Sequence, residues 1–179
     1  MTYLPARLRR SVVATVLAGL TLTACGHADP GVAAYVGNEE VSQSQVDQAV
    51  KGLGSIVDAG QTVSVEAVVN ALIQGELSDQ IAAEKKIVIT DADRDKVLKG
   101  TNLADLVKVP DAQPVVFDVA DQAIVAQQLG NAAYLDEVKK RTVTLNPRYG
   151  VLDPTQKTIL ADQSGSLSVP APNASVAAP

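Results

Sequence analysis

Apolar residues recur every three or four positions over most of residues 42–140, which is the spacing of amphipathic helices. Ser42 followed by Gln45 has the pattern of a capping box and marks the start of a first helix. Gly52 and Gly54 indicate where that helix ends. The apolar positions of this predicted helix are Val46, Ala49, Val50 and Leu53.

The second predicted helix is the longest and runs from about Ser64 to Lys86. After a short extended link, Thr90 with Asp93 has the pattern of another capping box and starts a third helix. Residues 102–107 are expected to form a further short helix. The apolar stripe of the long helix consists of Val65, Val68, Val69, Leu72, Leu77 and Ile81.

Two more helices are predicted in the second half of the chain. Pro114 suits the first position of a helix, and Gly130 suits its end. Asn131 is expected to cap a last helix that runs to about Lys140. The apolar positions of the first of these two helices are Val115, Val116, Val119, Ala123, Ile124 and Leu129.

Short strands are predicted on either side of the helices. The segments 32–36 and 39–41 flank Gly37-Asn38, a pair suited to a two-residue hairpin turn, and 143–145 precedes Pro147. Because a lone hairpin is marginal in water, we expect the first and last strands to pair. The expected fold class is therefore mainly α, with a small β element formed by the N-terminal hairpin and a C-terminal strand.

The first residues have the layout of an export signal. Arginines at positions 7, 9 and 10 precede an apolar run at residues 12–22, which is shorter than the ~20 residues that cross a bilayer as a helix. The run leads into Leu22-Thr23-Ala24-Cys25, which resembles the lipobox of bacterial lipoproteins. We interpret residues 1–24 as a lipoprotein signal peptide that is cleaved between Ala24 and Cys25.

Cys25 is the expected lipid attachment site, because the only cysteine of the chain stands where a lipobox requires one. Residues 25–31 would then be a lipidated tether that holds the protein at the extracytoplasmic face of the cell membrane. An ordinary secreted protein with an incidental cysteine is the alternative. Arg9-Arg10 leaves twin-arginine export open beside the general secretory route, which the surrounding residues favour.

The charge of the chain excludes one class of partner. Removal of residues 1–24 takes away three of the 15 basic residues and none of the 20 acidic ones, which leaves 12 minus 20, a formal charge of −8. Such a chain is repelled by nucleic acid, so nucleic acid is not an expected partner. The remaining aromatic residues are few, and the core must be built from Val, Leu, Ile and Ala.

Residues suited to catalysis or metal binding are scarce. His27 is the only histidine and lies in the tether, where it cannot be positioned as a catalytic base. Asp91, Asp93 and Asp95 alternate as at the start of an EF-hand, but Lys96 stands where that loop needs glycine. We expect no catalytic residue, no metal, no cofactor and no enzyme activity.

Three stretches resemble a known family. Residues 32–47 (VAAYVGNEEVSQSQVD) and 80–93 (QIAAEKKIVITDAD) are similar to the N-terminal chaperone domain of SurA and to related regions of PrsA foldase lipoproteins and trigger factor. Residues 145–154 (LNPRYGVLDP) are similar to the end of SurA-N-like lipoproteins of high-GC Gram-positive bacteria. In the last stretch, Arg148 and Tyr149 either form a binding pair or make contacts that fix how the final strand leaves the domain.

The resemblance implies a SurA-N-like helical domain over residues 32–162. Residues 163–179 are rich in Ser, Pro, Ala, Gly and Asn and carry no charge or period, so we expect them to form a disordered tail. It implies a membrane-tethered holdase that binds unfolded or partly folded exported polypeptides. The prolyl isomerase activity of the foldases is not carried over, because the chain has neither the length nor the His and Cys residues of a parvulin domain. The alternative is a non-catalytic module that docks on one envelope protein. The sequence does not indicate which surface binds.

Overall fold

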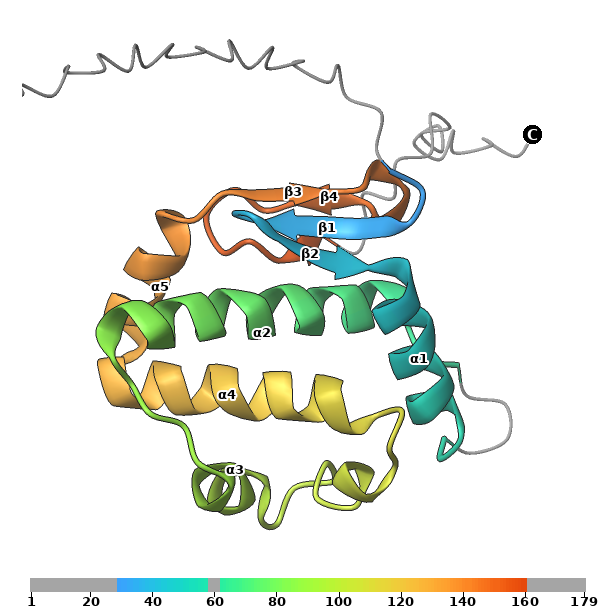
Figure 1. Cartoon of the computed structure of the whole chain (residues 1–179), viewed down its shortest axis with the longest axis horizontal. Coiled ribbons are helices and arrows are strands. Elements are labelled where there is room, and N and C mark those ends of the chain that lie inside the picture. The colour runs from blue at the N-terminus through green and yellow to red at the C-terminus, as the bar shows by residue number, and fades with distance from the viewer. Residues whose placement is uncertain (1–28, 58–61, 161–179) are drawn as a thin grey trace, which may run out of the picture.

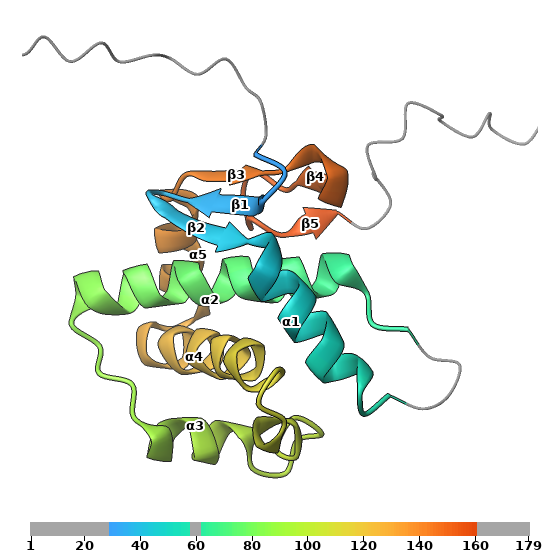
Figure 2. The same cartoon turned by 45° about the vertical axis from the view of Figure 1, so that its right-hand side comes forward.

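The computed structural model describes residues 29–57 and 62–160. These residues form four stacked layers. A small sheet lies on α2 (Val65–Lys85), α2 lies on α4 (Gln113–Leu129), and α3 (Asp91–Leu98) lies beyond α4 (Figure 1). The turned view shows α1 (Gln43–Gly54) crossing one end of α2 (Figure 2). The helices are α1 (Gln43–Gly54), α2 (Val65–Lys85), α3 (Asp91–Leu98), α4 (Gln113–Leu129) and α5 (Asn131–Lys139), and the strands are β1 (Val32–Val36), β2 (Glu39–Ser42), β3 (Val143–Leu145), β4 (Val151–Leu152) and β5 (Ile159–Leu160).

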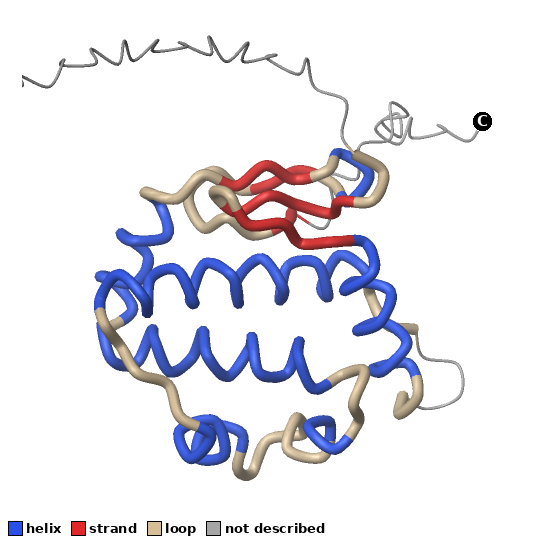
Figure 3. Tube along the Cα trace, viewed as in Figure 1, coloured by secondary structure: helices blue, strands red, loops and turns tan. Residues whose placement is uncertain are grey.

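The mainly helical fold class with a small β element is confirmed (Figure 3). Ser42 and Gln45 form a reciprocal capping box at the start of α1, and Thr90 and Asp93 form one at the start of α3. Ser64 accepts a hydrogen bond from a backbone N–H in the first turn of α2. These side chains satisfy backbone donors that a helix leaves free at its N-terminus.

Three local predictions were wrong. Residues 102–107 do not form a helix, because the chain passes through turns into a single 3-10 turn at Leu106–Lys108. Asn131 does not cap α5, since Gly130 occupies the cap position at a φ of 84°. Of the two glycines predicted to mark the end of α1, Gly54 is its last residue, but Gly52 lies buried inside the helix, where a Cβ would come within 2.4 Å of the backbone of Ala112.

The first and last predicted strands do pair. The sheet has the order β2-β1-β3, and Ala34 of β1 lies opposite Leu145 of β3. A second, two-stranded sheet of β4 and β5 was not predicted, because Val151–Leu152 and Ile159–Leu160 are too short to show a period. Ile159 packs on the main core and fastens this hairpin to α2.

The Asn146–Tyr149 segment closes the domain where the chain enters it. The side chain of Asn146 donates to the carbonyl of Val32 at 2.9 Å, and its backbone N–H donates to Ala33 at 2.9 Å. Tyr149 is buried, and its hydroxyl and the Arg148 guanidinium both donate to the Gln43 side chain. This arrangement supports a role in fixing how the last strand leaves the domain.

Helix α2 supplies the centre of the core, because the sheet covers one side of it and α4 the other (Figure 1). Its residues Ile73, Leu77 and Ile81 are fully buried. Within the described part of the chain, no helix is long and apolar enough to cross a membrane. The predicted signal peptide with its Ala24–Cys25 cleavage and lipidation site, and the tail at 163–179, lie outside the described residues.

Candidate functional site

Two apolar hollows lie along α4. The first has a volume of about 160 Å³ and opens between the N-terminal parts of α2 and α4, beside the end of α1. The second has a volume of about 420 Å³ and opens between α4 and α5. Val119 lines both hollows. We call the two together the α4 groove, and its main lining residues are Ala67, Ala71, Val115, Val119, Ala123, Ala126 and Leu135.

The α4 groove follows from the sequence of α4. Val115, Val119, Ala123 and Ala126 recur at spacings of three or four residues, which places them on one side of a helix. Several lining positions in α2 and α4 are alanines, whose short side chains leave space between larger neighbours. An apolar hollow with room left in it can accept apolar side chains of another polypeptide.

Beneath the second hollow, a polar network fixes α5 against α2. The Tyr134 hydroxyl and the Ser78 hydroxyl lie 2.9 Å apart, and Ser78 also donates to the carbonyl of Gln74. Gln74 accepts a hydrogen bond from Gln122 and donates to the carbonyl of Lys157 at 2.9 Å. These buried groups are therefore paired and hold the wall of the groove in one arrangement.

An acidic cluster lies on another side of the α2–α4 contact. Asp121 is buried and accepts two hydrogen bonds from the Arg94 guanidinium of α3, at 2.7 and 2.8 Å. Arg94 also stacks over the ring of Phe117 at 4.9 Å and pairs with Asp91 at 3.0 Å. A two-point pair of this kind, stacked on an aromatic ring, fastens α3 to α4.

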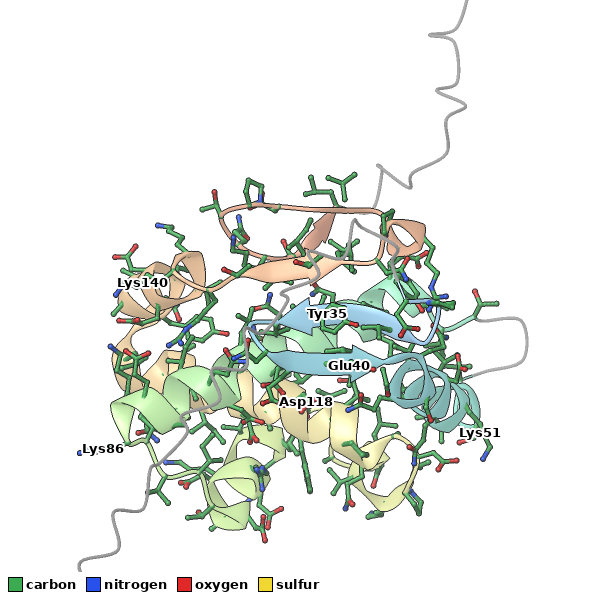
Figure 4. The ribbon with its side chains drawn as sticks, turned by 45° about the horizontal axis from the view of Figure 1, so that its top comes forward. Tyr35, Glu40, Lys51, Lys86, Asp118 and Lys140 are labelled. Atoms are coloured by element: carbon green, nitrogen blue, oxygen red, sulfur yellow. The ribbon has the colours of Figure 1, made fainter. Side chains whose placement is uncertain are left out.

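Asp118 is a carboxylate of this cluster to which Arg94 donates no hydrogen bond. It is half-buried, and Figure 4 labels it on α4. Burial, together with the nearby charges of Asp79, Asp121 and Glu76, raises the pKa of Asp118 to about 7, against the opposing charge of Arg94. The group therefore titrates near neutral pH.

A carboxyl group with a pKa near neutrality in a hollow is a candidate acid or base. Asp118 lines a polar hollow of about 230 Å³ together with Gln45, Gln48 and Asp111. Residues 29–57 and 62–160 contain no histidine and no cysteine, so no imidazole or thiol stands beside it there. In the same residues, no group of three or more potential ligands could hold a metal ion.

The structure places the residues of the suspected EF-hand pattern in other roles. Asp93 accepts hydrogen bonds from the backbone and hydroxyl of Thr90, and Asp91 pairs with Arg94. The α4 groove itself was not predicted as a site, although the apolar stripe of α4 was. The signal that could have indicated it is the series of alanines where a core-facing stripe normally carries larger residues.

Comparisons of the chain with protein-family models, with curated proteins and with solved structures find no match.

Proposed function

We propose that this chain is a membrane-tethered, extracytoplasmic, chaperone-like domain that holds apolar segments of unfolded exported polypeptides in the α4 groove. The observation that carries the proposal is the groove itself, two open and mainly apolar hollows that share Val119, are lined in part by alanines, and lie beside the end of α1 and beside α5. The resemblance of residues 32–47 and 80–93 to the SurA, PrsA and trigger factor chaperone regions supports the same function. The membrane tether rests on the lipobox ending at Cys25.

The polar chemistry of the domain supports binding rather than catalysis. Asp118 has no imidazole or thiol partner in the described residues, and Asp121 is paired with Arg94. Holding an apolar segment needs neither group. We therefore propose no catalytic residue and no prolyl isomerase activity.

A docking module for one envelope protein is the second candidate. It is favoured by the small number of large apolar side chains that the described surface exposes: Tyr35, Ile56, Val88, Leu135, Val151 and Leu160. Of these only Leu135 lines the α4 groove. A narrow groove suits one specific partner segment as well as short segments of many chains.

The holdase function predicts that the unlipidated chain from residue 26 onward suppresses aggregation of a denatured client at near-stoichiometric ratio without ATP. Replacing Ala123 by arginine fills the groove with a long charged side chain, so Ala123→Arg is expected to lose most of this suppression. Ala83→Arg, at an exposed position of α2 outside the groove, is the matched control and is expected to keep it. Light scattering measures the effect.

Two outcomes would contradict the holdase function. Absence of suppression by the unmodified chain at equimolar ratio would favour the docking module. Equal loss in both arginine variants would show that the groove is not the binding surface.

The same protein is expected not to accelerate isomerisation in a protease-coupled prolyl peptide assay, and measurable acceleration would overturn the non-catalytic proposal.

The lipid anchor predicts that Cys25→Ser abolishes incorporation of a fatty-acid analogue in the producing cell. The expected product is either uncleaved or released from the membrane fraction, because the lipobox cysteine carries both the acyl chains and the cleavage site. Metabolic labelling followed by fractionation measures both effects. Unchanged labelling of the serine variant would show that the protein is not acylated at this cysteine.

A further inference from the structure

The described chain begins at the sheet layer (Figure 1), and the outer face of the sheet is the face that points away from α2. Asp29, the first described residue, lines a hollow of about 40 Å³ together with Ala33, Tyr35 and Thr144. The other four residues of β1 (Val32, Ala33, Ala34 and Val36) are buried, and the register shifts between Val32 and Ala34. Tyr35 is the exposed residue of β1, and its partners Glu40 and Thr144 on the two neighbouring strands are exposed beside it.

The β4–β5 hairpin, a separate two-stranded sheet, also exposes apolar side chains. Ile159 packs on the core, and its backbone N–H donates to the side chain of Asn70 on α2. Its neighbour Leu160 must then point away from α2, and Val151 lies directly opposite Leu160 in the ladder. Both are exposed, at 43% for Val151 and 37% for Leu160, and Tyr35 is 39% exposed.

The strand side and the α3 side of the domain differ in the number of large apolar side chains that they expose. Of the six exposed large apolar residues in the described part of the chain, three stand on the strands of the sheet layer and none on α3 at the far side. The strand layer is the side shown forward in Figure 4, where Tyr35 is labelled beside Glu40. On α3, the exposed side chains include Asp91 and Asp95.

We propose that the outer face of the strand layer rests on the bilayer surface, so that the α4 groove is held on the side away from the membrane. The proposal rests on the lipidation of Cys25, which is part of the proposed function. Three residues lie between Cys25 and Asp29, and the four steps from one Cα atom to the other reach about 14 Å even when fully extended. So short a connection keeps the face around Asp29 at the head groups and excludes an orientation with α3 toward the bilayer.

The chemistry of the face indicates which lipid surface it fits. Tyrosine is favoured at the level of the head groups, and Val151 and Leu160 can lose apolar surface to water there. Glu40 is exposed next to Tyr35 and opposes an anionic surface. We therefore expect the contact to form on zwitterionic lipid and to weaken as the fraction of anionic lipid increases.

Single tryptophans test this orientation cleanly, since the chain contains none. Full-length lipidated Tyr35→Trp and Val151→Trp proteins are reconstituted in phosphatidylcholine vesicles that contain lipid brominated on the acyl chains. Val88→Trp, at an exposed position in the link from α2 to α3, is the matched control. Intact mass confirms acylation, and circular dichroism confirms the fold, before quenching is measured.

The expected result is a blue shift and strong quenching at positions 35 and 151, with neither at position 88. Equal quenching at positions 88 and 151, or none at 35 and 151 in verified acylated protein, would overturn the proposed orientation while leaving the anchor intact. Absence of the acyl chains in the intact mass would instead refute the lipid anchor on which the orientation rests. Binding of a client by the protein on the same vesicles is measured separately and reports on the α4 groove alone.

Discussion

Gly75→Ala is expected to lower the free energy of unfolding by about 2 kcal/mol, although alanine is the better helix former by ~1 kcal/mol. Gly75 is buried in α2 where this helix meets α4. A Cβ there would lie 2.4 Å from both Cβ and Cγ of Asp118, closer than non-bonded carbon atoms approach. The two helices must separate to admit it, which loosens the packing on both sides of the contact.

Thermal unfolding followed by circular dichroism measures this effect, and we expect the Tm to fall by roughly 5–10 °C. Gly54→Ala is the matched control, because a Cβ at Gly54 in the last turn of α1 meets no atom within 4 Å. It is expected to leave the Tm unchanged or raise it slightly. A Gly75→Ala protein as stable as the Gly54→Ala protein would show that α2 and α4 do not pack as closely as described.

Asp118→Asn is expected to stabilise the protein at pH 7.5 by about 2 kcal/mol, and much less at pH 4.5. The folded-state pKa of Asp118 is raised to about 7 from an ordinary value of 3.8, mainly by burial. The stability that this group contributes is therefore fully present below pH 3.8 and is lost as the pH rises through about 7. Each pKa unit corresponds to about 1.4 kcal/mol, and the partial exposure of the carboxyl group lowers the total.

Denaturant unfolding of both proteins between pH 4 and pH 8 measures the difference. We expect the gain from asparagine to grow between pH 4 and pH 7 and to stay constant above that. Asp95→Asn, at an exposed position of α3, removes one negative charge and is the control for net charge. A gain at Asp118 that does not change with pH, or that equals the gain at Asp95, would contradict the raised pKa.

Elements with local signals were predictable from the sequence. The capping boxes at Ser42 and Thr90 satisfy backbone groups within one turn, so their effect is contained in four residues. The signal of the β1–β2 turn is local as well, because Gly37 adopts a φ of 61° within the turn itself. The β1–β3 pairing was predictable for a different reason, because isolated short strands need partners.

Other features that depend on contacts between distant segments were not predictable. Gly52 resembled a helix end in the sequence, but its role is to let α1 approach the backbone at Asp111 and Ala112. Asp118 and Gly75 lie 43 positions apart, and nothing local indicates that one requires the absence of a side chain at the other. The α4 groove likewise requires the packing of α2, α4 and α5 to be known.

Site-specific photocrosslinking in the producing cell tests the central claim most directly. A photoreactive phenylalanine derivative at Leu135 stands at the wall of the α4 groove, and the same group at Val88 stands at an exposed position away from it. Mass spectrometry of the adducts identifies what each position contacts. We expect position 135 to trap many different exported polypeptides and position 88 to trap few. One adduct with a single envelope protein would contradict the chaperone-like function in favour of docking, and no adduct from position 135 would show that the groove binds no polypeptide.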